Sequence, residues 1–189
     1  MIKGGVKEMI YLVIGIIAIL VIYVLVTYNS LVKIKHRVEE AFSVMDVYLK
    51  KRWDLIPSIV ETVKGYAKHE KSTLSEVIEL RSGTYDDMSN DEKIEANQKL
   101  SKNIAKIMAL VEQYPELKAN ENFKDLNSQL IKAEDDIANS RKYYNGTVRE
   151  FNDKVQMFPS NIVAMIFGYK SKSMFEAKEE ERKNIEVSF

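Results

Sequence analysis

The chain has 189 residues, and its 28 Lys and Arg residues balance its 28 Asp and Glu residues, so the formal net charge is zero. A neutral chain lacks the basic excess that binds phosphate backbones, and the absence of cysteine excludes disulfides, thiol nucleophiles and cysteine-ligated metal sites. Few glycines (7) and prolines (3), with 30% charged residues, are typical of long helices. The composition therefore predicts an all-α fold and no nucleic-acid partner.

Residues 9–26 (MIYLVIGIIAILVIYVLV) contain no charged side chain and predict a transmembrane helix. As a helix this run is roughly 27 Å long, close to the ~30 Å hydrocarbon core of a bilayer. A cleaved signal peptide is the competing interpretation, but its apolar core spans only about 7–15 residues, and no small-residue cleavage site follows this run. We expect a short tail over residues 1–8 and an uncleaved anchor over residues 9–28, with the lipid bilayer as its partner.

The basic residues that flank this segment predict its orientation. Lys3 and Lys7 precede it, whereas Lys33, Lys35 and Arg37 follow it closely. Positively charged flanks favour the cytoplasmic side of a membrane. We therefore expect a single-pass protein of the cell membrane with its N-terminus outside and the remainder in the cytoplasm.

Helical periodicity continues directly after the anchor. Apolar residues recur at three- and four-residue steps from Val38 to Ala67, and Pro57 falls inside this pattern. Because proline cannot donate a backbone hydrogen bond, it predicts a kink or a short break near Asp54. Alternatively, Asp54 caps a new helix whose first turn contains Pro57.

Three further helices are predicted along the chain. They cover residues 70–81, residues 94–111 and a long stretch from Asn120, a suitable N-cap, to Phe158, just before Pro159. In the long stretch an apolar residue recurs at every seventh position, the spacing typical of coiled-coil packing. The repeat consists of Phe123, Leu130, Ile137, Tyr144, Phe151 and Phe158.

Helices with apolar seams must bury them against one another, and short connections favour antiparallel neighbours. We expect an antiparallel four-helix bundle of the up-and-down type over residues 29–168, followed by a charged tail over residues 169–189. Two long helices, with the two shorter ones stacked end to end as a third, are the alternative.

Several motifs add to this interpretation. The match includes residues 46–57 (DVYLKKRWDLIP), within which the block 52–57 is specific, and further matches lie at 28–32 (YNSLV), 114–120 (YPELKAN) and 158–161 (FPSN). In these motifs the sequence resembles the LemA family of bacterial membrane proteins, over roughly residues 28–168. The resemblance implies one N-terminal transmembrane helix, a short outward tail and a four-helix bundle, and it implies no defined biochemical role.

Catalytic and metal-binding patterns are incomplete in this sequence. His69-Glu70 begins like a zinc-protease helix, but Thr73 stands where the second histidine ligand is required. The acidic residues 134–136 and the Asp86-Asp87 pair lack the spacing of a calcium loop, and we interpret them as solvated. We expect no catalytic residue, no metal and no cofactor, and a protein that is not an enzyme.

One cluster of residues has two open interpretations: Arg52, Trp53, Asp54 and Pro57. The structural interpretation is an ion pair beside the proline, with Asp54 also capping the break. The functional interpretation is a recognition notch in which Trp53 is an exposed anchor. The first is the ordinary explanation of such residues and is preferred.

Taken together, these features predict a membrane-anchored, non-catalytic interaction or scaffold module whose protein partner is unknown. The alternative is a self-assembling structural or remodelling protein of the cell envelope that associates through its helices.

Overall fold

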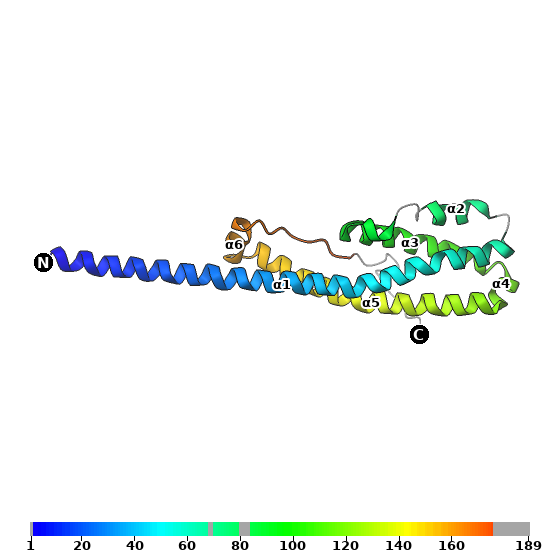
Figure 1. Ribbon diagram of the computed structural model, residues 1–189, viewed down its shortest axis with the longest axis horizontal. Coiled ribbons are helices and arrows are strands. Elements are labelled where there is room, and N and C mark those ends of the chain that lie inside the picture. Colours follow the sequence, from blue (N-terminus) through cyan, green and yellow to red (C-terminus); the bar gives the residue numbers. More distant parts are fainter. Residues whose placement is uncertain (1, 68–69, 80–83, 176–189) are drawn as a thin grey trace, which may run out of the picture. The chain divides into compact units, whose positions relative to one another are not determined.

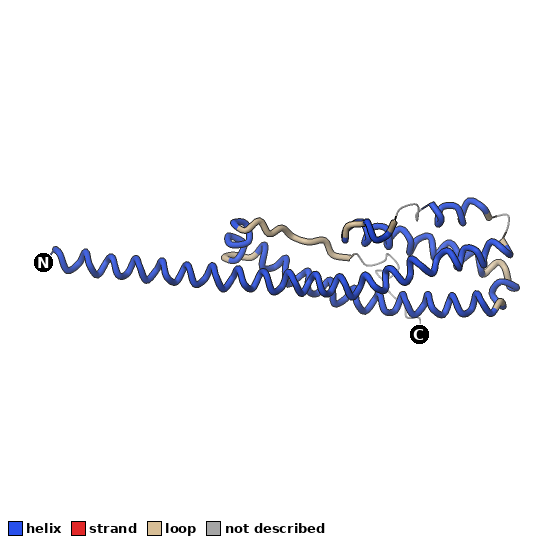
Figure 2. The backbone as a smooth tube through the Cα atoms, viewed as in Figure 1, coloured by secondary structure: helices blue, strands red, loops and turns tan. Residues whose placement is uncertain are grey.

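A computed structural model describes residues 2–67, 70–79 and 84–175, and these residues form helices and their connections without a β-strand (Figures 1 and 2). The all-α prediction is confirmed for this part of the chain. Our expectations for His69, for the helix end at residues 80–83 and for the tail over residues 176–189 lie outside it. The elements are α1 (Ile2–Tyr66), α2 (Lys71–Glu79), the 3₁₀ turn η1 (Tyr85–Asp87), α3 (Asn90–Val111), α4 (Pro115–Ala119), α5 (Glu121–Gln156) and α6 (Ser160–Ile166).

Helix α1 runs without interruption through Pro57. The predicted membrane segment and the first amphipathic helix are therefore one helix, and the expected break or cap at Asp54 is wrong. The missing hydrogen bond of a helical proline costs about 3 kcal/mol or more. The side chains of Trp53, Ile56 and Val60, on both sides of the proline, are all buried, and this packing offsets the cost.

The N-terminal part of α1 is apolar and exposed. By length and composition α1 can cross a membrane, and no side chain from Lys7 to Ile22 is buried. A soluble helix normally buries one face against its own protein. This segment buries none.

The described residues divide into two compact units, and the larger one takes in Ala41–Tyr144. Its core is formed by α1, α3 and α5. Helix α2 packs on α3, and its Glu76 forms an ion pair with Nζ of Lys106 on α3 at 2.5 Å. Because Glu76 meets the second half of α3, α2 and α3 lie side by side and not end to end, which corrects our alternative arrangement (Figure 1). The most deeply buried apolar side chains include Met45, Leu49, Ile56, Leu100, Ile107 and Ala133.

The start of each long helix in this unit is fixed by a cap. Ser89 Oγ accepts a hydrogen bond from the backbone N–H of Glu92, whose carboxylate in turn accepts from the backbone N–H of Ser89. The hydrogen bonds from Ser89 lower the pKa of Glu92. At α5, Asn120 Oδ1 accepts from the Phe123 N–H at 3.0 Å, which confirms Asn120 as the predicted N-cap.

The second unit contains parts of Met1–Glu40 and Asn145–Met174, and its core joins α1 to α6. Leu31 of α1 is buried together with Val163 and Ala164 of α6. Helix α6 was not predicted, because its own sequence gives only a short apolar run and the contact with α1 stabilises it.

Candidate functional site

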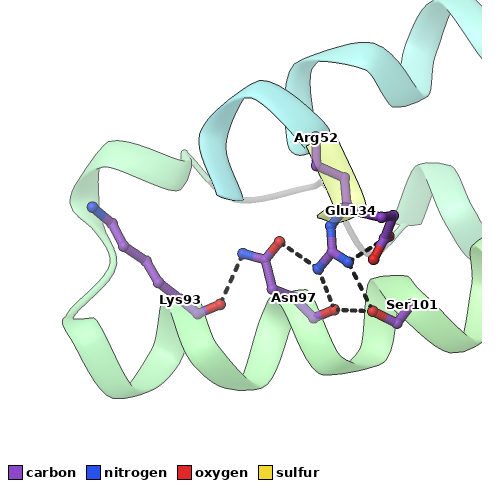
Figure 3. A network of polar contacts seen from close by, with 5 residues as sticks. All are labelled: Arg52, Lys93, Asn97, Ser101 and Glu134. Atoms are coloured by element: carbon purple, nitrogen blue, oxygen red, sulfur yellow. Dashed lines mark hydrogen bonds and ion pairs between the residues drawn. The ribbon is translucent and has the colours of Figure 1, made fainter. Parts of the chain in front are cut away.

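Arg52, the central residue of the predicted cluster, is buried. Its side chain is 1% exposed, and its guanidinium joins three helices (Figure 3). Nη2 donates to both the backbone carbonyl and Oδ1 of Asn97 on α3, each at 2.8 Å. Nη1 donates to Ser101 Oγ at 2.9 Å and to Glu134 Oε1 on α5 at 2.7 Å. One side chain of α1 therefore holds α3 and α5 at once.

The acceptors around Arg52 are themselves held in place. Asn97, which is fully buried, donates from Nδ2 to the backbone carbonyl of Lys93 at 3.0 Å. Ser101 Oγ donates to the Asn97 carbonyl at 3.1 Å. Burying an unpaired charge is costly, and the ion pair with Glu134 and these neutral hydrogen bonds offset the cost of removing the Arg52 guanidinium from water.

Tyr85, from the turn before α3, extends this network. Its hydroxyl donates to Asp46 Oδ1 at 2.7 Å and accepts from Asn97 Nδ2 at 3.4 Å. Asp46 is also paired with Lys93 Nζ at 2.8 Å. The buried Tyr85 ring lies 5.3 Å from the ring of Trp53, centroid to centroid. Two ion pairs are thus connected through Asn97 and Tyr85, and burial together with Asp46 raises the pKa of Tyr85 well above its usual value.

The four predicted residues do not share one surface. Arg52 and Trp53 point into the core, whereas Asp54 and Pro57 are exposed. Trp53 is 2% exposed, so the expectation that it is an exposed anchor is wrong. Asp54 pairs with Lys50 one turn earlier, at 2.7 Å, and Arg52 pairs with Glu134. Neighbouring positions on a helix face different directions, which separates these pairs.

Sequence reasoning missed most of the partners of Arg52. Glu134 was interpreted as solvated, but its side chain is only 25% exposed and carries the ion pair. A signal was present at Asn97, which occupies a core position between Ile94 and Leu100 at three-residue spacing. A polar residue inside an apolar seam requires a buried partner.

The arrangement is suited to holding helices together. Each charged group of the network is matched by an opposite charge, and its hydrogen bonds join α1, α3 and α5. Among residues 2–67, 70–79 and 84–175, no three His, Asp or Glu side chains gather in a way that could hold a metal ion.

Comparison with known proteins identifies the family. The LemA family profile matches residues 41–189, well over half of the chain. The chain belongs to the LemA family. It is 25% identical over 190 residues to protein LemA of Metamycoplasma hominis, a match that covers 99% of this chain and 87% of that relative.

Shorter similarities involve magnetosome proteins. MamQ 1 of Paramagnetospirillum magneticum is 33% identical and MamQ of Magnetospirillum gryphiswaldense is 32% identical, each over 75 residues. Those matches cover 40% of this chain and 28% of each relative. They are partial, whereas the match to the LemA family extends over most of the chain.

The run 46–57, one of the stretches in which the sequence resembles the LemA family, coincides with the α1 side of the network. Residues 46–57 supply Asp46, Arg52 and Trp53. In this chain the motif therefore has a structural function, namely to connect α1 to α3, to α5 and to the turn that carries Tyr85.

We expect Arg52→Ala to lower the free energy of unfolding by about 3–5 kcal/mol, because Glu134 would then be left without its buried counter-charge. Chemical denaturation of the full chain in mild detergent measures this loss. Arg37→Ala is the matched control, since Arg37 also lies on α1 and pairs with Glu150 at 3.1 Å, but the side chains of Arg37 and Glu150 are both exposed. The control is expected to cost less than about 1 kcal/mol. Equal losses for the two variants would contradict the account.

The buried tyrosines predict a loss of stability in alkali. Burial raises the pKa of Tyr144 to about 12, and the pKa of Tyr85 is raised as well, whereas an unfolded tyrosine ionises near pH 10. Above pH ~10 the folded chain retains protons that the unfolded chain has lost, so stability is complete below this pH and falls as the pH rises. Phenolate absorbance of the folded chain should show a late component that is reduced in Tyr85→Phe or Tyr144→Phe alone and disappears when both tyrosines are replaced. Ionisation of all tyrosines together near pH 10 would refute the prediction.

Proposed function

We propose that this LemA-family protein is a membrane-anchored, non-catalytic interaction module. Residues 9–28 of α1 cross the cell membrane once, the N-terminus lies outside and the larger unit lies in the cytoplasm. The observation that carries this proposal is the exposed, uncharged run of α1, which no other residue in the described part of the chain buries. A bilayer supplies the missing apolar environment at the right thickness.

The function of the larger unit in this proposal is to present a well-ordered helical surface to a protein partner. The support comes from the hydrogen bonds of Arg52 to Asn97 on α3 and to Glu134 on α5, which join these helices to α1. In the proposed arrangement α1, α3 and α5 are the long helices of an antiparallel bundle and α2 is its short fourth member. The partner is bound by the outer faces of these helices.

Single-cysteine labelling tests the anchor and its orientation, because the natural chain contains no cysteine. Ser128, which is exposed on α5, is replaced by cysteine and treated with a membrane-impermeant maleimide. We expect labelling only after cell lysis. Lys7→Cys is the matched control and should be labelled in intact cells. Labelling of Ser128→Cys in intact cells would contradict the cytoplasmic placement, and labelling of neither variant before lysis would contradict a membrane-spanning segment.

The alternative, a self-assembling structural or remodelling protein of the cell envelope, predicts a different behaviour in solution. Sedimentation of the full chain in detergent should give one constant protein mass at all concentrations if the chain is an interaction module. A mass that increases with protein concentration would favour self-assembly through the helices and would count against the module.

A further inference from the structure

The segment between α5 and the end of α6 carries a dense group of exposed apolar side chains. Residues 157–169 (MFPSNIVAMIFGY) contain no charged residue. Scattered exposed apolar residues are ordinary on proteins, but a contiguous group indicates a surface that is covered by something else. The exposed fractions are 62% for Met157, 79% for Phe158, 47% for Ile162, 73% for Met165, 68% for Ile166 and 49% for Phe167.

This exposure belongs to an ordered part of the chain. Helix α6 buries Val163 and Ala164 against α1, which turns the opposite side of α6 outward. A Schellman motif closes the helix: the Tyr169 N–H donates to the Ala164 carbonyl at 2.9 Å, and Gly168 takes a left-handed φ of 71°. The apolar side chains are therefore held outward by a fixed backbone.

Helix α6 lies beside the end of the apolar run of α1. Tyr23, Val24 and Tyr28 of α1 pack against its buried core, and the rings of Tyr28 and Phe167 are 4.5 Å apart, centroid to centroid. The next charged residue of α1 is Lys33. A membrane that contains residues 9–28 would therefore have its head-group boundary at the level of α6.

The surrounding residues fit such a boundary. Tyrosines gather where α1 leaves the apolar run, and aromatic rings with a polar group prefer the membrane interface. Lys170 and Lys172 follow the segment directly, and Lys154 reaches Ser30 of α1 at 2.7 Å. Long basic side chains at this level can extend to lipid phosphates.

We propose that residues 157–169 form a second membrane contact, in which the outer side of α6 lies in the interface of the bilayer crossed by α1. Ile162, Met165 and Ile166 rest on the upper acyl chains, and Lys170 and Lys172 face the head groups. This inference depends on the proposed membrane anchor. Lipid is the occupant because the apolar surface of α6 continues the lipid-facing surface of α1 within the same unit.

The test measures the depth of single fluorophores in the full chain. Cysteine variants at Ile166, Leu20 and Ile131 are each labelled with an environment-sensitive NBD probe and reconstituted into phosphatidylcholine–phosphatidylglycerol vesicles. The vesicles contain lipids with a spin label either near the head group or at mid-chain. Ile131 is the matched control, because it is an exposed isoleucine of α5 in the other unit. Met165→Cys, on the same side of α6, guards against a local effect of one substitution.

We expect the probes at positions 166 and 165 to emit at shorter wavelength and to lose intensity more with the head-group spin label than with the mid-chain label. The probe at position 20 should be quenched most by the mid-chain label, and the probe at position 131 by neither. Quenching at position 20 with an aqueous spectrum at positions 165 and 166 would overturn this inference and leave the anchor intact.

Two other outcomes would also overturn it. A probe at position 20 that no lipid quenches would remove the anchor, and the interfacial contact with it. A shifted emission at positions 165 and 166 without lipid quenching would mean that protein, such as a second copy of the chain, covers α6.

Discussion

The packing of α1, α3 and α5 in the larger unit centres on the buried guanidinium of Arg52. The Arg52 guanidinium is buried between α1, α3 and α5. The cost of burying its charge is offset because Asn97, Ser101 and Glu134 accept its hydrogen bonds. Those partners lie on two helices, so the pairing requires a particular register for both. An apolar contact tolerates a shift of one helix along another better than such a fixed set of acceptors does.

The network and the core support each other. Trp53 and Tyr85 bury their rings together, and this places the Tyr85 hydroxyl on Asp46 and next to Asn97. The short turn before α3 is in this way attached to α1. The two rings exclude water from the polar contacts beside them. This strengthens those contacts, because electrostatic interactions are stronger at low dielectric constant.

The local parts of this structure could be predicted from sequence, and the distant pairings could not. The seven-residue repeat identified α5, and Asn120 identified its first turn, because both are patterns within one helix. Arg52 and Glu134 are 82 positions apart, and no local pattern pairs them. Pro57 wrongly predicted a break in α1, because tertiary packing outweighs a single missing hydrogen bond. Helix α6 was not predicted, because its contact with Leu31 of α1 stabilises it.

A double-mutant cycle on Arg52 and Glu134 tests the central claim most directly. The free energy of unfolding is measured for the natural chain, Arg52→Met, Glu134→Leu and the double variant. Each single change leaves a buried charge or its acceptors unmatched. The double variant should therefore lose less unfolding free energy than the sum of the two single losses, by about 0.5–3 kcal/mol. Strictly additive losses would show that Arg52 and Glu134 do not act as a pair.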